Sequence, residues 1–277
     1  LSAMAGLATI ALGVWFARFV SVALQRQDWV GWVSFGLLAA AALAMAAMVL
    51  REIIGLVLLT RMHRVKKDAD RALADGDGEL AKSVVKRLRR AFAGRRALAL
   101  GQARLIEHER DIMSAAELLK LADRELLARL DGEARRIVVG CAKRVSMVTA
   151  MSPVATLTVG YVVVENLRML RRLAGLYGGR PGLIGLARLA RMVFTHIIVT
   201  GGIALTDDLL HQFLGQDLLR RLSRRLGEGV FNGTLTARVG TAAIAVIRPL
   251  PFLDSEAPRL RDMVGELLKR EKIATQG

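Results

Sequence analysis

The sequence predicts an all-α protein: a transmembrane helical hairpin followed by a cytoplasmic helical domain. Three observations support this fold class. Two long apolar runs lie near the N-terminus, apolar residues recur at helical spacing further on, and no proline occurs between residues 1 and 152, where one would interrupt a helix. The chain has 277 residues, is 53% hydrophobic and carries a formal net charge of +16. It is therefore more apolar and more basic than soluble domains, which are about 45–50% apolar.

The charges divide the chain into three regions. Residues 1–60 hold three basic and two acidic side chains, residues 61–150 hold 21 and 13, and residues 151–277 hold 17 and 10. A nearly uncharged opening before two cationic regions is typical of a membrane anchor with an attached domain. We expect a transmembrane hairpin over 1–60, a basic cytoplasmic helical region over 61–150, and a C-terminal helical domain with an apolar helix pair over 151–277.

Two apolar runs are long enough to cross a bilayer, which takes about 20 helical residues. Residues 1–20 contain a single charge, Arg18, near the end of the run, where a guanidinium can reach the interface. Residues 29–50 contain no charge and have an alanine-rich centre that suits close helix packing. Trp29 and Trp32 start this second run, and indole rings favour the headgroup level. Spans are expected at about 1–20 and 29–50.

The link at residues 25–28 allows only a tight turn, so the two spans form a hairpin. Arg26 is the one cation of the link. Five cations follow the second span: Arg61, Arg64, Lys66, Lys67 and Arg71. Positive charge stays in the cytoplasm, so the C-terminal domain is expected on the cytoplasmic side of a bacterial inner membrane. These cations either signal topology alone or also contact anionic headgroups.

Two other interpretations of the opening are disfavoured. A cleavable signal peptide would need a basic start and a small-x-small site, and a second apolar run follows at once. Buried helices of a soluble protein rarely run 22 residues without a charge. The chain begins at Leu1 rather than methionine, so we expect a fragment. Its single cysteine, Cys141, excludes an internal disulfide and fits a reducing cytosol.

Helical spacing continues through residues 61–150. One helix is predicted over 80–92, capped by the acidic, glycine-containing turn at 75–79. A calcium loop in that turn is disfavoured, because Lys86 stands where the last acidic ligand belongs. A further helix is predicted over 111–130, ended by Gly132, with another helix after it.

A group of cations follows the turn: Lys86, Arg87, Arg89, Arg90, Arg95 and Arg96. We interpret it either as solvated surface or as a contact surface for membrane lipids or an acidic partner. Nucleic acid would also favour such a cluster. It is not expected as a partner, because no stacking platform or reading motif accompanies the cations.

Residues 145–164 form a third run without charge, long enough to be a third span. Ser152 and Pro153 lie in its middle, and serine at the N-cap followed by proline starts a new helix. Cations flank both ends, so charge gives no direction. We expect two buried helices meeting at this break, with a third span or a re-entrant segment as the alternative. Residues 192–206 are also apolar, but too short to span comfortably.

No catalytic constellation stands out in the sequence. Neither a phosphate-binding loop of the G-x-x-x-x-G-K-[ST] type nor a G-x-S-x-G elbow occurs. Asp207, Asp208 and His211 could share one helix face and hold a metal, but a helix start beside a surface histidine is the favoured interpretation. We therefore expect no catalysis, no cofactor and no metal.

The C-terminal half carries a more specific pattern. The run GEGVFNGTLTARVG at residues 227–240, followed by RPLPF at 248–252, resembles the signature of YcjF-like inner-membrane proteins. The hairpin, the break at Ser152 and the GLYG run at 175–178 come in the order that this family shows, so the similarity covers nearly the whole chain. It implies two or three spans, a hydrophilic N-terminal extension, and a C-terminal helical domain of unknown function that elsewhere accompanies GTPase domains.

These signature residues also have a direct physical interpretation. Asn232 and the glycine after it are expected to form a turn or helix stop, and Gly240 to let a helix approach its neighbour. The two prolines of residues 248–252 are expected to end the domain as an extended segment. Arg238 and Arg248 lie among small and apolar residues, so we expect a salt-bridge network or an acidic partner.

The resemblance implies a partner, a YcjX-like P-loop NTPase, rather than an activity of the chain itself. The leading hypothesis is an inner-membrane scaffold or regulatory protein that recruits this NTPase, contacts membrane lipids and forms homo-oligomers. The expected contact residues are Lys86, Arg87, Arg89, Arg90, Asn232, Arg238 and Arg248. One alternative is a channel or transport component built from oligomerised spans, although the spans carry few ionisable residues. Another is an enzyme that acts on lipid or nucleotide.

Overall fold

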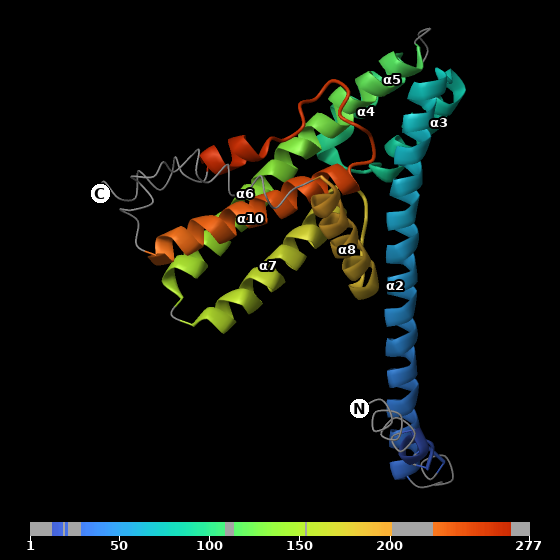
Figure 1. Ribbon diagram of the computed structural model, residues 1–277. Helices are drawn as coiled ribbons and strands as arrows, with labels where there is room; N and C mark the ends of the chain where they lie inside the picture. The colour runs from blue at the N-terminus through green and yellow to red at the C-terminus, as the bar shows by residue number, and fades with distance from the viewer. Residues whose placement is uncertain are drawn as a thin grey trace. The chain divides into compact units, whose positions relative to one another are not determined.

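The computed structural model describes residues 13–18, 20–21, 29–108, 114–152, 154–200 and 224–266. Over these residues the protein is helical and contains no strand, which confirms the all-α fold class (Figure 1). The chain divides into two compact units, Leu1–Ile53 and Ile54–Gly277. The second unit includes all of the predicted regions 61–150 and 151–277.

The first unit contains the start of a long apolar helix whose large side chains are exposed. Helix α2 (Trp29–Asp75) begins in this unit, and residues 13–18 and 20–21 are also helical. Large apolar side chains of α2 are exposed, among them Trp32 at 73% and Leu43 at 71%. The helix is long and apolar enough to cross a membrane, and lipid would remove these side chains from water. The rest of the predicted first span, and the link 25–28, lie outside the described residues.

The second unit begins with the remainder of α2, whose side chains enter a core. Its buried residues follow helical spacing: Met62, Val65, Ala69 and Ala72. Gly76 turns the chain with a positive φ of 66°, and α3 (Gly78–Ala91) follows. The Asp77 carboxylate accepts a hydrogen bond from the backbone N–H of Leu80 at 3.0 Å. This confirms the predicted cap, and α3 covers nearly the predicted range.

After α3 come the short 3₁₀ helix η1 (Arg96–Leu98) and α4 (Ala99–His108). Helix α5 (Ala115–Ala122) starts with a capping box in which Ser114 and Glu117 bond each other's backbone N–H. A π-helical turn, η2 (Asp123–Leu127), then joins it to α6 (Ala128–Met151).

The predicted helix stop at Gly132 is wrong, because α6 runs through this residue. A glycine inside a helix costs only about 1 kcal/mol relative to alanine. Burial of Leu130, Ala134 and Val138 on either side outweighs that cost. The helical geometry is irregular instead at η2, the π-helical turn that begins at Asp123, nine residues before Gly132.

The predicted break near Ser152 is confirmed, since α6 ends at Met151 and α7 (Ala155–Leu176) begins after it. Ser152 is the C-cap of α6, however, and Val154 is the N-cap of α7. The Ser152 hydroxyl donates to the Val154 carbonyl at 3.2 Å, so it is not placed to cap α7. Burial of both helices was also predicted, and it is confirmed for one face only: Val145, Thr149 and Thr158 are buried, whereas the opposite face is exposed. Met151 and Leu157 are 74% and 70% exposed.

Helix α10 (Arg224–Ile247) lies along α6, and α7 packs against both of them. Helix α8 (Leu183–Val199) packs against α7 and α10, and the four helices lie together in Figure 1. α10 also has the length and composition of a span, but 56% of its most apolar 18-residue stretch is buried. It therefore serves as a core helix of this unit.

Glycines of α10 bring it close to α6. A Cβ added at Gly233 would lie 3.0 Å from that of Ser146, and one at Gly240 would overlap the Val138 side chain. The expected role of Gly240 is thus confirmed. The predicted helix stop at Asn232 is wrong, because the following glycine serves packing and α10 continues. The helix ends at Ile247, before the prolines, as predicted.

Candidate functional site

Two carboxylates lie on the buried face of η2 and α6. Leu119, Asp123, Leu127 and Asp131 follow one another at intervals of four, so they share one helix face. The Asp123 side chain is fully buried, and that of Asp131 is 10% exposed. A buried carboxylate is strongly unfavourable unless it is paired and hydrogen-bonded.

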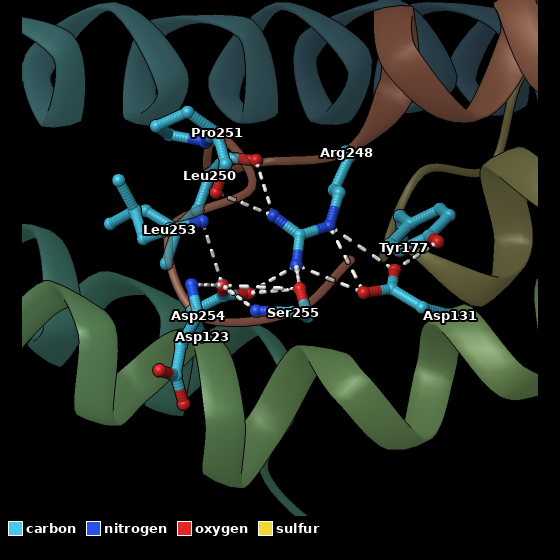
Figure 2. Close-up of polar contacts among 9 residues, drawn as sticks. All are labelled: Asp123, Asp131, Tyr177, Arg248, Leu250, Pro251, Leu253, Asp254 and Ser255. Atoms are coloured by element: carbon cyan, nitrogen blue, oxygen red, sulfur yellow. Dashed lines mark hydrogen bonds and ion pairs between the residues drawn. The ribbon is translucent and has the colours of Figure 1, made fainter. Parts of the chain in front are cut away.

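Arg248 pairs with both carboxylates (Figure 2). It follows the last residue of α10, and its side chain is 1% exposed. Its Nε lies 3.2 Å from each Asp131 oxygen, and its Nη2 lies 2.9 Å from Asp131 Oδ2 and also contacts Asp123. Its Nη1 donates to the carbonyls of Leu250 and Pro251, both at 2.7 Å. The guanidinium also lies 4.0 Å from the centre of the Phe252 ring, at cation–π distance.

Asp123 binds the backbone that follows Arg248. Its Oδ2 accepts from the N–H groups of Leu253, Asp254 and Ser255, at 2.9, 2.9 and 3.1 Å. The Ser255 hydroxyl accepts from Arg248 at 2.8 Å and donates to Asp123 at 3.1 Å. Burial alone would raise the pKa of the Asp123 carboxyl. The backbone N–H groups and the Arg248 charge outweigh burial and hold that pKa below its ordinary value.

Tyr177 completes the group from the end of α7. Its hydroxyl donates to Asp131 Oδ1 at 2.6 Å. Burial, with the negative charge of Asp131, raises the pKa of the Tyr177 hydroxyl. Burial would lower the pKa of Arg248, but the two aspartates raise it above its ordinary value. Arg248, Asp123, Asp131, Tyr177 and Ser255 form what we call the Arg248 network.

The network is suited to holding elements together. All three nitrogens of the Arg248 guanidinium donate hydrogen bonds, and both carboxylates accept several. Its members come from η2, α6, the end of α7 and the segment after α10, as Figure 2 shows. A buried charge cluster satisfied in this way fixes the C-terminal segment 250–255 across three elements.

A third buried carboxylate, outside the Arg248 network, joins α6 to α7. Glu165, 7% exposed, accepts from Arg144 Nε at 2.7 Å and lies 3.7 Å from Arg168. The Cys141 thiol donates to the Glu165 backbone carbonyl at 3.6 Å. Burial, with the nearby Glu165 charge, raises the pKa of this thiol to about 12. Since the thiolate is the reactive form, Cys141 is protected from modification at neutral pH.

The structure divides the predicted basic cluster. Arg87 forms an ion pair with Asp68 at 2.7 Å. Arg95 donates to the carbonyls of Leu176 and Gly175 at 2.6 and 3.0 Å. Lys86 and Arg90 are exposed, with Arg89 half-buried beside them on α3. The contact surface that the cluster offers is therefore smaller than the sequence indicates.

The other predicted contact residues belong to α10 and the segment after it. Asn232 is half-buried and donates to Thr149 Oγ1 at 3.4 Å. Arg238 is half-buried on the same helix. Arg248 lies in a salt-bridge network, one of the two environments expected for it. Asp207, Asp208 and His211, expected to be a helix start beside a surface histidine rather than a metal site, lie outside the described residues.

Sequence reasoning missed Asp123, Asp131 and Tyr177. A signal for the two aspartates was present, since each follows a leucine of the apolar stripe by four residues and so interrupts a buried face. Tyr177 had no such signal beyond its place in the GLYG run. No group of three or more metal-ligating side chains occurs within the described parts of the chain.

The chain resembles known proteins over most of its length. Residues 113–272 match the family described as "Domain of unknown function (DUF697)". A UPF0283 membrane protein of Rhizobium meliloti (strain 1021) is 46% identical over 261 residues, covering 94% of this chain and 73% of the relative. The UPF0283 membrane protein of Brucella canis is 42% identical over 263 residues, covering 95% and 74%. No solved structure matches the chain.

The helical fold, the exposed apolar helix and these relatives together define an α-helical membrane protein. More particularly, the chain belongs to the UPF0283 family of membrane proteins, and its C-terminal part carries the DUF697 domain.

Proposed function

We propose that this protein is a membrane-anchored scaffold. Its hairpin holds the helical domain at the cytoplasmic face of a bacterial inner membrane, and the domain recruits a soluble P-loop NTPase. The protein performs no catalysis of its own in this role. It passes through the membrane more than once, with its C-terminal domain in the cytoplasm.

One observation carries the proposal: a single helix serves both as anchor and as part of the domain. The first half of α2 is apolar and exposed, whereas Met62, Val65 and Ala69 near its end are buried in the second unit. An exposed apolar segment favours lipid as its surroundings, and the buried residues that follow it belong to a folded domain. This order of segments suits a protein that presents a surface at the membrane.

Recruitment of an NTPase is supported by the resemblance to YcjF-like proteins and by surface charge. The chain has a formal net charge of +16, and Lys86 and Arg90 are exposed on α3. A cationic surface speeds encounter with an acidic partner and improves its selection. The exposed apolar side chains Met151 and Leu157 add a second surface that favours contact with protein or lipid.

Recruitment can be tested by pull-down. The detergent-solubilised protein is incubated with its own cytosolic fraction without nucleotide, with ADP or with a non-hydrolysable ATP analogue. We expect a protein with a G-x-x-x-x-G-K-[ST] motif to be retained, and retention to depend on nucleotide. The purified NTPase should then bind directly. Failure to retain such a protein in any nucleotide state contradicts the proposal.

A pair of variants tests the surface. Lys86→Gln with Arg90→Gln should weaken binding of the purified NTPase. Lys120→Gln with Arg136→Gln removes one exposed lysine and one exposed arginine from α5 and α6 and should not. If both double variants lose binding equally, the effect reflects overall charge rather than a binding surface on α3.

Topology can be tested by cysteine accessibility. Single cysteines are placed at residues 25, 180 and 260, and a membrane-impermeant maleimide is added to intact spheroplasts. In intact spheroplasts we expect the maleimide to label residue 25 only. After lysis it should also label residues 180 and 260. Label at residue 180 or 260 in intact spheroplasts contradicts a cytoplasmic domain.

A further inference from the structure

A hollow of about 720 Å³ opens in the second unit, between α2 and α8, with the end of α10 in its wall. Its basic lining residues are His63, Lys66, Lys67, Arg188, Arg191 and His196. We call it the cationic hollow. Its volume lies within the range of about 300–1,000 Å³ typical of small-ligand sites.

The walls do not balance the charge of the cationic hollow. Four lysines and arginines line it against one carboxylate, that of Asp70. Within the described ranges, the side chains of Lys67, Arg188 and Arg191 take part in no hydrogen bond or ion pair. Cations gathered around one space repel one another. An anion in the hollow would offset this repulsion.

Two other arginines of the same unit are paired with carboxylates, unlike those of the hollow. Arg87 bonds Asp68 and Arg144 bonds Glu165, both at 2.7 Å. Lys66 is also held in place, because its Nζ donates to the Ala245 carbonyl at 2.6 Å. That carbonyl belongs to the last turn of α10, where the helix offers no partner. One lysine is thus fixed in the wall, and three cations remain available.

The hollow is apolar as well as cationic. Met192, Val199 and Val246 also line it, and Val199 is 78% exposed. Arginine forks and lysine ammonium groups are the side chains that proteins use for phosphate oxygens. An apolar wall beside them suits a phosphate that carries carbon substituents.

We propose that the cationic hollow is a binding site for a phosphate ester, with Lys67, Arg188 and Arg191 contacting the phosphate oxygens. Met192 and Val199 contact the organic part of the ligand. Two sources share this chemistry, an anionic phospholipid headgroup and a soluble phosphate monoester. Lys66 and Lys67 follow the apolar run 29–50 within the same helix, and basic segments on the cytoplasmic side attract anionic lipid.

The test measures binding of defined probes to the full chain in a non-ionic detergent. Short-chain phosphatidylglycerol is titrated and bound lipid is counted by native mass spectrometry, with the uncharged diacylglycerol of equal chain length as the lipid control. Glycerol 1-phosphate is titrated separately by calorimetry, with glycerol as its control.

The variant Lys67→Gln, Arg188→Gln, Arg191→Gln removes the three unpaired cations. We expect it to bind the phosphate probe at least about tenfold more weakly, because each charge-assisted hydrogen bond contributes to affinity. The matched control is Lys120→Gln, Arg136→Gln, Arg171→Gln. It removes one lysine and two arginines that are exposed elsewhere in the unit and should bind like the wild type. The single change Arg191→Gln keeps most of the charge and should give an intermediate loss, which guards against misfolding of the triple variant.

The outcomes separate the two sources. Binding of phosphatidylglycerol alone, lost in the triple variant, assigns the site to lipid. Binding of glycerol 1-phosphate, lost in the same variant, assigns it to a soluble ester. Absence of binding for both probes overturns the proposal. So does equal loss in the triple variant and its matched control, since binding would then reflect overall charge.

Discussion

The guanidinium of Arg248 and the carboxylate of Asp123 form an ion pair across 125 residues of chain, with side chains 1% and 0% exposed. Asp131 shares the same guanidinium. Ion pairs at the surface contribute little. A buried pair has a different consequence: removing one member leaves the other charge without compensation. The stability of the domain should therefore depend on Arg248 to an extent that its surface arginines do not show.

Replacing Arg248 by methionine should destabilise the domain by about 3–5 kcal/mol, because Asp123 and Asp131 would remain buried without their cation. Urea unfolding in detergent, followed by far-ultraviolet circular dichroism, measures the change in midpoint. Arg248→Lys should restore only part of the loss, since an ammonium lacks the planar fork that reaches both carboxylates. The exposed Arg136→Met is the control and should change stability by no more than about 0.5 kcal/mol. A midpoint for Arg248→Met equal to that of this control contradicts the assigned role.

The Asp123 carboxylate should make the stability of the folded domain fall at acidic pH. Its folded pKa lies below its ordinary value, so the ionised form is the one stabilised by folding. The stabilisation is complete above the unfolded pKa, about 3.9, and is lost as pH falls through the lower folded pKa. The melting temperature should therefore fall steeply below about pH 4.

Asp123→Asn should lower the melting temperature at pH 7 and make the decline below pH 4 shallower, because the group that titrates is gone. Melting curves between pH 7 and pH 2.5 provide the measurement. Asp75→Asn, at an exposed position, should keep the wild-type decline. If Asp123→Asn also declines as steeply as the wild type, other carboxylates are responsible.

The contact between Gly240 and Val138 predicts that α10 tolerates no larger side chain at position 240. An added Cβ would overlap the Val138 side chain, which is fully buried and, being β-branched, has little rotamer freedom in a helix. Gly240→Ala should thus destabilise the domain by about 1–3 kcal/mol through overpacking. In a Val138→Ala background the same change should be much less unfavourable, which a double-mutant cycle measures. Equal effects in the two backgrounds would show that α6 and α10 do not meet there.

Gly132 provides the matched comparison for Gly240. It also lies inside a helix, but a Cβ there meets nothing within 4 Å. Gly132→Ala should therefore stabilise α6 by about 0.5–1 kcal/mol, the usual gain from replacing a helical glycine by alanine. If the two substitutions change the free energy of unfolding in opposite directions, the effect of packing is separated from that of helix propensity.

The features that the sequence predicts correctly are set by residues adjacent to one another along the chain. The uncharged run 29–50, the cap at Asp77 and the end of α10 before Pro249 each follow from a few adjacent residues. The close approach at Gly240 was also anticipated, although its partner, Val138, was not. Gly132 and Asn232 were misjudged because a local helix-breaking tendency of about 1 kcal/mol is smaller than the burial that surrounds them.

The Arg248 network could not be predicted in the same way. Arg248 was recognised as a charge that needed a partner, but its partners lie 117 and 125 residues away. Only the packing of α10 along α6 brings them together. The cationic hollow has the same origin, because its lysines come from α2 and its arginines from α8.

The thiol of Cys141 should resist alkylation in the folded protein, because it is buried against Glu165 and burial raises its pKa to about 12. A maleimide reacts with the thiolate, which is scarce at pH 7.5 when the pKa is so high. The native protein in detergent should therefore remain unlabelled for hours, and should be labelled within minutes after unfolding in sodium dodecyl sulfate. Met151→Cys provides a reactive comparison, because Met151 is 74% exposed. Mass spectrometry after digestion distinguishes the two positions. Rapid label at Cys141 in the native protein would mean that α6 and α7 separate readily, and that the Glu165 contacts do not hold them together.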